Sequence, residues 1–231
     1  MQKGNAVGVI GCVLVLMVML ISGCATTTAY SPPEPLLPGQ SDHTYGVGVD
    51  SLAVPGIDLK AKTYVILSAM QNVSDNDLQF QEFARYIENA LSQKGYIRKN
   101  SKEGTDLLIR LAYWIGEPQT TTSTQTYTTG TGYSYPVGWM WYTVPPQTHQ
   151  ETTTETLYKK TLVLEAYNLK DTARQSQLWK ISLRSTNPIG DLRFFLPYMI
   201  TAGVPYFGVD SGGEKEIDIY GRDPMILEIR K

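Results

Sequence analysis

Runs of apolar residues alternate with polar segments along the chain and predict both strands and helices. Residues 62–70, KTYVILSAM, and residues 106–116, DLLIRLAYWIG, are β-branched and aromatic runs of the length expected for strands. Between them, from about Asp77 to Lys94, apolar side chains recur at helical spacing, and Gly95 is a natural residue to follow a helix end. The apolar face of this helix consists of Phe80, Phe83, Ala84, Ile87, Ala90 and Leu91. We therefore expect a helix that packs on a sheet.

Two further features concern the helix boundaries. Ser74, with Asp77 three residues later, approximates a capping box and suggests that Ser74 caps the first helix. A second amphipathic helix follows Asp191, with Leu192, Phe195, Leu196, Met199 and Ile200 on its apolar face. Pro197 lies inside this pattern and predicts either a kink or a late helix start.

Residues 157–169 and 177–186 read as a pair of strands joined by a polar turn, and residues 215–221 read as a closing strand. A strand and helix followed by hairpins favours an α+β fold, with a mostly antiparallel sheet and helices packed on one face. We expect a single α+β domain over residues 44–231.

Residues 117–156 form an insert of different composition within this domain. Two threonine-rich arms, at 119–132 and 150–157, predict one long β-hairpin stabilised by cross-strand threonine pairs. Its middle carries an aromatic cluster of Tyr133, Tyr135, Trp139, Trp141 and Tyr142. The alternation of Tyr133 with Tyr135 and of Trp139 with Trp141 predicts that these four rings share one face. An exposed cluster of this kind suits docking of a protein, a glycan or a membrane surface. The alternative is that the tip folds back and covers a sheet edge.

The N-terminus carries the features of a bacterial lipoprotein signal peptide. The apolar run from Ala6 to Ile21 is short for a membrane span, which needs roughly 20 residues, and it suits a signal peptide core. Ile21, Ser22, Gly23 and Cys24 then resemble the lipobox. We expect residues 1–23 to be a signal peptide cleaved between Gly23 and Cys24. Cys24 would then carry a thioether-linked diacylglycerol and an amide-linked acyl chain such as palmitate, which together meet the need for more than one lipid. A short anchor helix that happens to end in cysteine is the alternative.

Residues 24–43 contain four prolines and read as a stiff spacer between the lipid and the domain. Ala25, rather than aspartate, follows the cysteine, which by resemblance to enterobacterial lipoproteins favours the outer membrane. We expect a lipid-anchored protein of the bacterial outer membrane that faces the periplasm. Beyond the signal peptide the sequence holds no cysteine except Cys24, so we expect no disulfide framework.

Charge and motifs offer little that suggests catalysis. The 20 basic and 22 acidic side chains give a formal net charge of −2, so we do not expect the protein to bind nucleic acid. The two histidines, His43 and His149, are far apart, and we expect no metal site and no cofactor apart from the lipid on Cys24. Residues 209–213, VDSGG, imitate the nucleophile region of trypsin-like proteases, but no histidine base has the matching context. A hydrolase centred on Ser211 is therefore the least favoured reading, and a glycine-rich turn the preferred one.

Five short core patterns resemble the bacterial lipoprotein family called domain of unknown function 4136. They are residues 64–67, 90–96, 105–111, 162–169 and 178–183, and the resemblance extends over residues 60–220. It implies a small α+β domain exported on a lipid anchor and carries no catalytic residues. We expect a non-enzymatic structural or protein-interaction role in the cell envelope, with an envelope protein as partner of the aromatic tip. The alternative is a module that uses the tip to bind peptidoglycan or another glycan.

Overall fold

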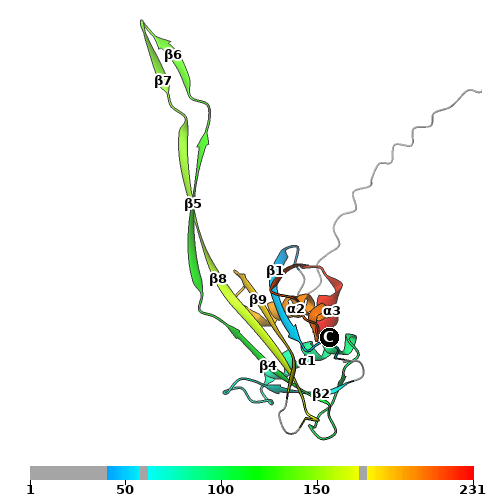
Figure 1. Cartoon of the computed structure of the whole chain (residues 1–231). Coiled ribbons are helices and arrows are strands. Elements are labelled where there is room, and N and C mark those ends of the chain that lie inside the picture. The colour runs from blue at the N-terminus through cyan, green and yellow to red at the C-terminus, as the bar shows by residue number, and fades with distance from the viewer. Residues whose placement is uncertain (1–40, 58–61, 172–175) are drawn as a thin grey trace, which may run out of the picture. The chain divides into compact units, whose positions relative to one another are not determined.

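The computed structural model describes residues 41–57, 62–171 and 176–231. The predicted signal peptide, the predicted lipidation site Cys24 and most of the predicted spacer lie outside these residues. Within them the fold is α+β, as the sequence predicts. Figure 1 shows the elements in chain order, from blue to red.

The main sheet has the strand order β10-β1-β9-β8-β4-β2-β3, with β5 pairing to a further length of β8. The strands from β10 to β4 run antiparallel, whereas β2 pairs in parallel with both β4 and β3. The sheet is therefore mixed, although mostly antiparallel. Its strands are β1 (Thr44–Ala53), β2 (Thr63–Ser68), β3 (Ile97–Arg98), β4 (Leu107–Ile115), β5 (Gln119–Thr129), β8 (Gln147–Asn168), β9 (Gln177–Asn187) and β10 (Lys215–Tyr220). A separate two-stranded sheet consists of β6 (Tyr133–Val137) and β7 (Met140–Val144).

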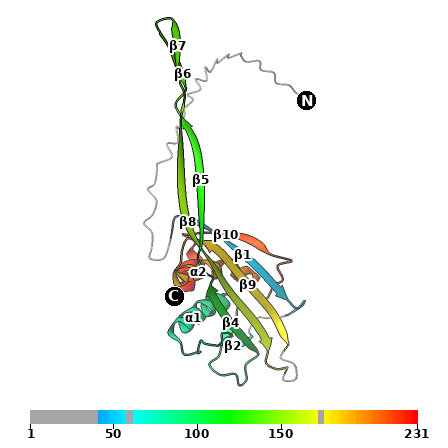
Figure 2. The same cartoon turned by 90° about the vertical axis from the view of Figure 1, so that its left-hand side faces the viewer.

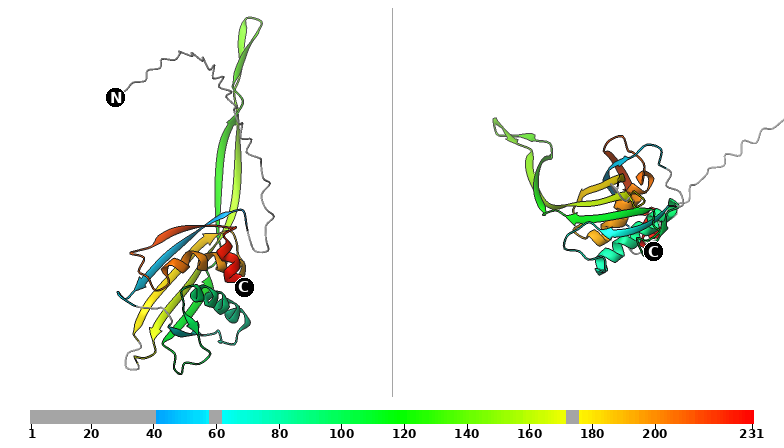
Figure 3. Two further views of the ribbon diagram at one scale, coloured as in Figure 1. Left: turned by 90° about the vertical axis from the view of Figure 1, so that its right-hand side faces the viewer. Right: turned by 60° about the horizontal axis from the view of Figure 1, so that its bottom comes forward.

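The helices lie on one face of the main sheet, as Figures 2 and 3 show. They are α1 (Leu78–Gln93), α2 (Leu192–Gly203), a short 3-10 turn η1 (Val204–Tyr206) and α3 (Pro224–Arg230). Alternate residues of the strands point toward these helices and are buried, for example Ile109 on β4, Leu164 on β8 and Ile181 on β9. Phe83 of α1 and Phe195 of α2 close the core from the other side. The helix-covered face is thus the buried face, as period-two alternation requires.

Two helix boundaries differ from the sequence expectation. Asp77, not Ser74, caps α1, because its carboxylate accepts the backbone N–H of Phe80 at 2.9 Å. Ser74 instead closes the preceding turn: its hydroxyl accepts the N–H of Asn76, and its carbonyl accepts that of Asp77. Ser74 and Asp77 both carry a side-chain oxygen that can cap a helix. Asp77 is the one nearer in sequence to Phe80, the first residue of the apolar face, and the helix begins directly after it.

Pro197 does not delay the second helix, contrary to one of the two effects predicted for it. The helix begins at Leu192, directly after Asp191, whose carboxylate accepts the N–H of Arg193 at 2.8 Å. Pro197 sits inside α2 and is buried among the apolar residues of the core. A capped first turn and a well-packed apolar face outweigh the hydrogen bond that proline cannot donate.

Residues 41–43, which the sequence assigns to the spacer, lie against the strand end after β10. The N–H of Ser41 donates to the carbonyl of Gly221 at 3.1 Å, and the N–H of Gly221 donates to the carbonyl of His43 at 2.8 Å. A Cβ at position 221 would lie 2.2 Å from the carbonyl oxygen of Ser41, so only glycine permits this approach.

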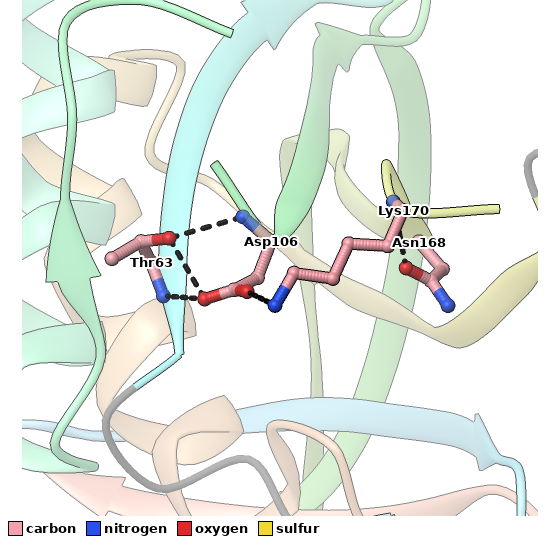
Figure 4. Close-up of polar contacts among 4 residues, drawn as sticks. All are labelled: Thr63, Asp106, Asn168 and Lys170. Atoms are coloured by element: carbon pink, nitrogen blue, oxygen red, sulfur yellow. Dashed lines mark hydrogen bonds and ion pairs between the residues drawn. The ribbon is translucent and has the colours of Figure 1, made fainter. Parts of the chain in front are cut away.

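The Asp106 carboxylate links one end of the parallel pair β2–β4 by hydrogen bonds and an ion pair (Figure 4). The carboxylate accepts the backbone N–H and the hydroxyl of Thr63, both at 2.8 Å, and pairs with the ammonium group of Lys170 at 2.5 Å. The Thr63 hydroxyl in turn accepts the N–H of Asp106 at 3.0 Å, and Asn168 accepts the N–H of Lys170. The hydrogen bonds from Lys170 and Thr63 hold the pKa of Asp106 well below its usual range. This carboxylate therefore joins β2, β4 and the end of β8.

We predict that Asp106→Ala lowers the free energy of unfolding by about 2 kcal/mol at neutral pH, because charge-assisted hydrogen bonds to Thr63 and Lys170 are lost. The pKa is depressed in the folded state, so this contribution is present above the unfolded value and is lost as the pH falls through the folded one. Denaturant titrations of the two proteins should therefore converge only in strong acid. The exposed Glu103→Ala is the control for loss of a negative charge. An equal effect of both substitutions would contradict the assignment.

Candidate interaction site

The insert folds into a long two-stranded ribbon made of β5 and the first half of β8. Gln119–Thr129 pairs with Gln147–Leu157 in antiparallel register, and the side chains along both strands are largely exposed. Threonine hydroxyls meet across the ribbon, at 3.4 Å between Thr122 and Thr154 and at 3.3 Å between Thr124 and Thr152. The expected threonine-rich hairpin is thus observed.

The register divides the ribbon into two different faces. One face, which we call the threonine face, is uniform apart from Gln150 and consists of Thr120, Thr122, Thr124, Thr126, Thr128, Thr148, Thr152, Thr154 and Thr156. The other face mixes polar, acidic and aromatic side chains, including Glu151, Glu155 and the stacked rings of Tyr127 and His149, whose centroids are 5.7 Å apart. Because side chains alternate along β8, the threonine face continues the face on which Leu162 and Leu164 are buried.

The ribbon leaves the core at a buried lysine that the sequence analysis did not single out. Lys160 is 0% exposed, and its ammonium group donates to the side-chain oxygen of Asn187 at 2.7 Å and to the carbonyl of Tyr158 at 3.2 Å. It also lies 4.9 Å from the ring centroid of Phe195. Burial lowers the pKa of Lys160 to about 8. The sequence could have predicted this burial, because Lys160 lies in the same strand as Leu162 and Leu164 and, at a spacing of two residues, on the same face.

Beyond the ribbon, β6 and β7 form a second hairpin, which we call the tip. Gly138 and Trp139 make its two-residue loop, and Gly138 has φ +63°, a conformation that favours glycine in such turns. Figure 1 shows the tip at the end of the ribbon farthest from the helices. The five aromatic residues predicted as an interaction site all belong to it, and all are exposed: Tyr133 61%, Tyr135 42%, Trp139 92%, Trp141 72% and Tyr142 59%.

The aromatic side chains do not share one face, contrary to the sequence expectation. Tyr135 pairs with Tyr142 across the hairpin, and Tyr133 pairs with Val144, so these side chains point to the same side. Trp141 pairs with Pro136 on the opposite side, and Trp139 lies in the loop. The prediction treated the segment as one continuous strand, whereas the two-residue loop restarts the alternation.

One face of the tip is apolar along its whole length. Tyr133, Tyr135, Val137, Met140 and Tyr142 all lie on it, and each is at least 42% exposed. The rings of Tyr133 and Tyr135 lie 6.1 Å apart, and those of Tyr135 and Tyr142 lie 5.6 Å apart, so the aromatic side chains contact one another. In this structure the tip side chains remain open to solvent instead of packing on a sheet edge.

Ser211, the candidate nucleophile, is a structural residue in this fold. It is 4% exposed, and its hydroxyl accepts the backbone N–H of Ser51 at 2.9 Å, with the carbonyl of Gly213 2.7 Å away. Its own N–H donates to the carbonyl of Ser51 at 2.8 Å. Because β10 pairs with β1 only as far as Val49, Ser211 supplies the hydrogen bonds that the next part of β1 would otherwise lack.

Ion pairs also occur on the surface of the described residues. A hollow of about 760 Å³ between β2 and α1 contains the pairs Arg98–Glu88 and Arg193–Glu82, the latter at 2.8 Å. Within residues 41–57, 62–171 and 176–231, no three histidine, cysteine, aspartate or glutamate side chains gather as a metal site would require. The same residues contain no helix of the length and apolarity needed to cross a bilayer.

Comparison with known proteins places the core in a recognised family. The model of the family described as "Domain of unknown function (DUF4136)" matches residues 57–192, more than half of the chain. No curated protein matches.

Solved structures resemble the chain only distantly. A PDZ domain protein from Parabacteroides distasonis shares 15% identity and a TM-score of 0.40, and the alignment covers 78% of this chain and 39% of that protein. The PelC dodecamer from Paraburkholderia phytofirmans shares 10% identity and a TM-score of 0.37, covering 70% and 95%. A DUF4136 family protein from Bacteroides thetaiotaomicron shares 17% identity and a TM-score of 0.36, covering 69% and 92%. The chain thus spans well under half of the first of these proteins.

We predict that the stability of this protein rises in alkaline solution because of Lys160. Its pKa is about 8 in the folded state against 10.5 for an unburied lysine, so between these values the unfolded chain binds more protons. The free energy of unfolding should therefore increase relative to that of Lys160→Met by up to about 3 kcal/mol over this range. Urea titrations of both proteins at several pH values measure the difference, in which the tyrosines cancel. A difference independent of pH would show that Lys160 titrates normally.

Proposed function

We propose, from the premise that the chain belongs to the DUF4136 family, that it is a lipid-anchored protein of the bacterial outer membrane. In this proposal its role is structural and non-enzymatic, and the tip docks on another protein of the cell envelope. The observation that carries the proposal is the apolar face of the tip, exposed at the end of a polar ribbon.

The composition of the tip supports a docking role. Trp139 is 92% exposed and Trp141 is 72% exposed, and tyrosine and tryptophan are the residues enriched at the centres of protein interfaces. A two-stranded hairpin without a packed face is marginally stable in water, so covering its apolar side would stabilise both the tip and the complex. A scattered exposed residue needs no such account, but a contiguous apolar strip does.

The shape of the insert supports the same role. β8 is a 22-residue strand that runs without interruption from the core into the ribbon. The ribbon pairs eleven residues of β5, and at about 3.4 Å per residue it separates the tip from the core by roughly 37 Å. Apart from Tyr127, its exposed side chains are polar, so the apolar side chains of the insert gather in the tip.

The anchoring part of the proposal rests on the sequence. The lipobox-like residues 21–24 follow an apolar run too short for a stable span, and Cys24 supplies the thiol for lipid attachment. At about 3.1 Å per residue, a proline-rich segment from Cys24 to Ser41 would let the domain stand roughly 50 Å from the membrane.

We predict that Cys24→Ser moves the protein from the membrane fraction to the soluble fraction of cells. The thiol is the acceptor of the lipid, so its removal abolishes anchoring while leaving the domain unchanged. Fractionation, together with metabolic labelling by an alkyne fatty acid, measures both effects. Thr28→Cys, which adds a thiol outside the motif and leaves Cys24 in place, is the control and should stay labelled. An unlabelled parent chain, or a Cys24→Ser protein still held in the membrane, contradicts the proposal.

We predict that a photo-crosslinking amino acid at Trp139 captures a discrete protein partner in living cells. The matched control carries the same group at Gln79, which is exposed on α1 far along the chain from the tip. A band from position 139 alone supports docking through the tip, and mass spectrometry then identifies the partner. The absence of any intermolecular adduct at position 139 contradicts the proposal. Co-sedimentation with purified cell wall that is lost in Trp139→Ala/Trp141→Ala would instead indicate a glycan.

A further inference from the structure

The outer edge of β5 is an unpaired strand edge of unusual character. β5 pairs with β8 on one side only, and on the other side its eleven residues face no strand among the described residues. Soluble proteins protect such edges with lysine, proline, bulges or a covering loop. β5 reads QTTTSTQTYTT, without a charge, a proline or a glycine, and its ladder with β8 shows no register shift.

The opposite edge of the ribbon is different. β9 ends opposite Tyr158, so residues 147–157 of β8 also lack an outer partner in the described structure. That length of β8 carries Glu151, Glu155 and His149, which disfavour pairing with an equally acidic strand. The two edges are therefore unequal, and the edge of β5 is the one left open to pairing.

The sequence of β5 is symmetric in the way that self-pairing requires. When two copies of one strand pair antiparallel about a two-fold axis normal to the sheet, one residue lies opposite itself. Pairing all eleven residues of β5 places Thr124 on the axis, so that residue 122 meets 126 and residue 120 meets 128. Each of these positions is threonine.

These pairs repeat a contact that the ribbon already makes. Thr122 and Thr124 form hydroxyl contacts with Thr154 and Thr152 across the internal ladder, and the self-paired strands would make the same threonine pairs on the same face. The threonine face would then extend over four strands, interrupted only by Gln150 of each copy. In the alternative pairing, β5 would lie antiparallel to the β8 edge of a second copy. The two ribbons would then point in the same direction, and the two cores, each several strands wide, would have to lie side by side.

Room exists for the antiparallel arrangement at the base of the ribbon. β2 pairs with β4 only from Leu107 to Leu111, so the outer edge of β4 from Ala112 to Ile115 faces no strand in the described structure. Trp114 and Ile115 are 49% and 37% exposed there. In this register the second β5 ends at Thr129, opposite Gln119, and residues 133–136 of the second tip come beside the free edge of β4 at residues 112–115.

We propose that the outer edge of β5 is a homodimerisation site, at which a second copy of this chain pairs antiparallel about Thr124 to form the four-stranded sheet β8-β5-β5-β8. The proposed pairing uses the backbone edge of the ribbon and not the aromatic side chains, so it is tested separately from docking of the tip.

The test is disulfide trapping in the full chain, with Cys12 and Cys24 left in place and the unsubstituted chain as background. Thr124→Cys alone should form a disulfide-linked dimer on mild oxidation, because opposed Cα atoms in an antiparallel pair fit the span of a disulfide. Thr120→Cys and Thr128→Cys should each give only background when alone and a dimer when mixed. Thr152→Cys, on the same face but on β8, should give only background.

Charge placement tests the register in the Thr124→Cys background. Thr122→Lys/Thr126→Lys opposes like charges across the two-fold axis and should abolish the dimer, whereas Thr122→Lys/Thr126→Glu opposes unlike charges and should keep it. Far-ultraviolet circular dichroism checks that both variants fold. Three outcomes would each overturn the proposal. They are a dimer yield from Thr124→Cys no higher than that of the unsubstituted chain, a disulfide-linked dimer from Thr120→Cys alone, and a dimer from Thr152→Cys but not from Thr124→Cys.

Discussion

The continuity of β8 is the constraint on which the arrangement of the whole insert depends. One strand of 22 residues is buried at one end, where Leu162 and Leu164 enter the core, and exposed at the other. Side chains alternate along a strand, and the register shift in the ladder of β8 with β9 lies beyond the leucines, between Ala166 and Tyr167, so a slip of one residue between the ribbon and Leu164 would turn the threonine face to the other side. The core therefore fixes the register of residues in the ribbon that contact no core at all. A polar hairpin on its own would lack this reference.

Threonine suits a ribbon that must form without a hydrophobic face. Its β-branched side chain restricts χ1 and favours extended backbone, while its hydroxyl remains hydrated. Its threonines thus give the ribbon strand propensity without adding a large apolar surface, and apart from Tyr127 the exposed aromatic side chains of the insert lie in the tip. A valine-rich ribbon of the same length would be as extended but would expose an apolar face on each side. Because threonine is extended like valine but polar, a threonine ribbon can hold an aromatic tip away from the core without exposing two apolar faces of its own.

The sequence predicts much of the core and less of the insert. Helix α1 and strands β4, β8 and β9 follow from periodicity, because each has a continuous buried stripe. Periodicity does not report which of two nearby side-chain oxygens caps a helix, which is why Ser74 is the predicted cap whereas Asp77 is the observed one. It also does not report loop length, and the two-residue loop at Gly138 decides that Trp141 points away from Tyr135. The parallel pairing of β2 with β4 depends on strand order, which no local pattern contains.

Lys160 shows why the transition from core to ribbon is abrupt. On the buried face of β8 the sequence passes from Thr156 and Tyr158 to Lys160 and then to the leucines, and the lysine is the first of these to be completely buried. A buried ammonium group costs free energy unless its donors are satisfied, and here Asn187, at the very end of β9, accepts its strongest hydrogen bond. That contact ties the last residue of β9 to β8 at the point where the sheet narrows to two strands. Leucine at position 160 would pack as well against Phe195, but it would leave the Asn187 side chain and the end of β9 without this contact. The lysine therefore serves less to stabilise the core than to define where the core ends.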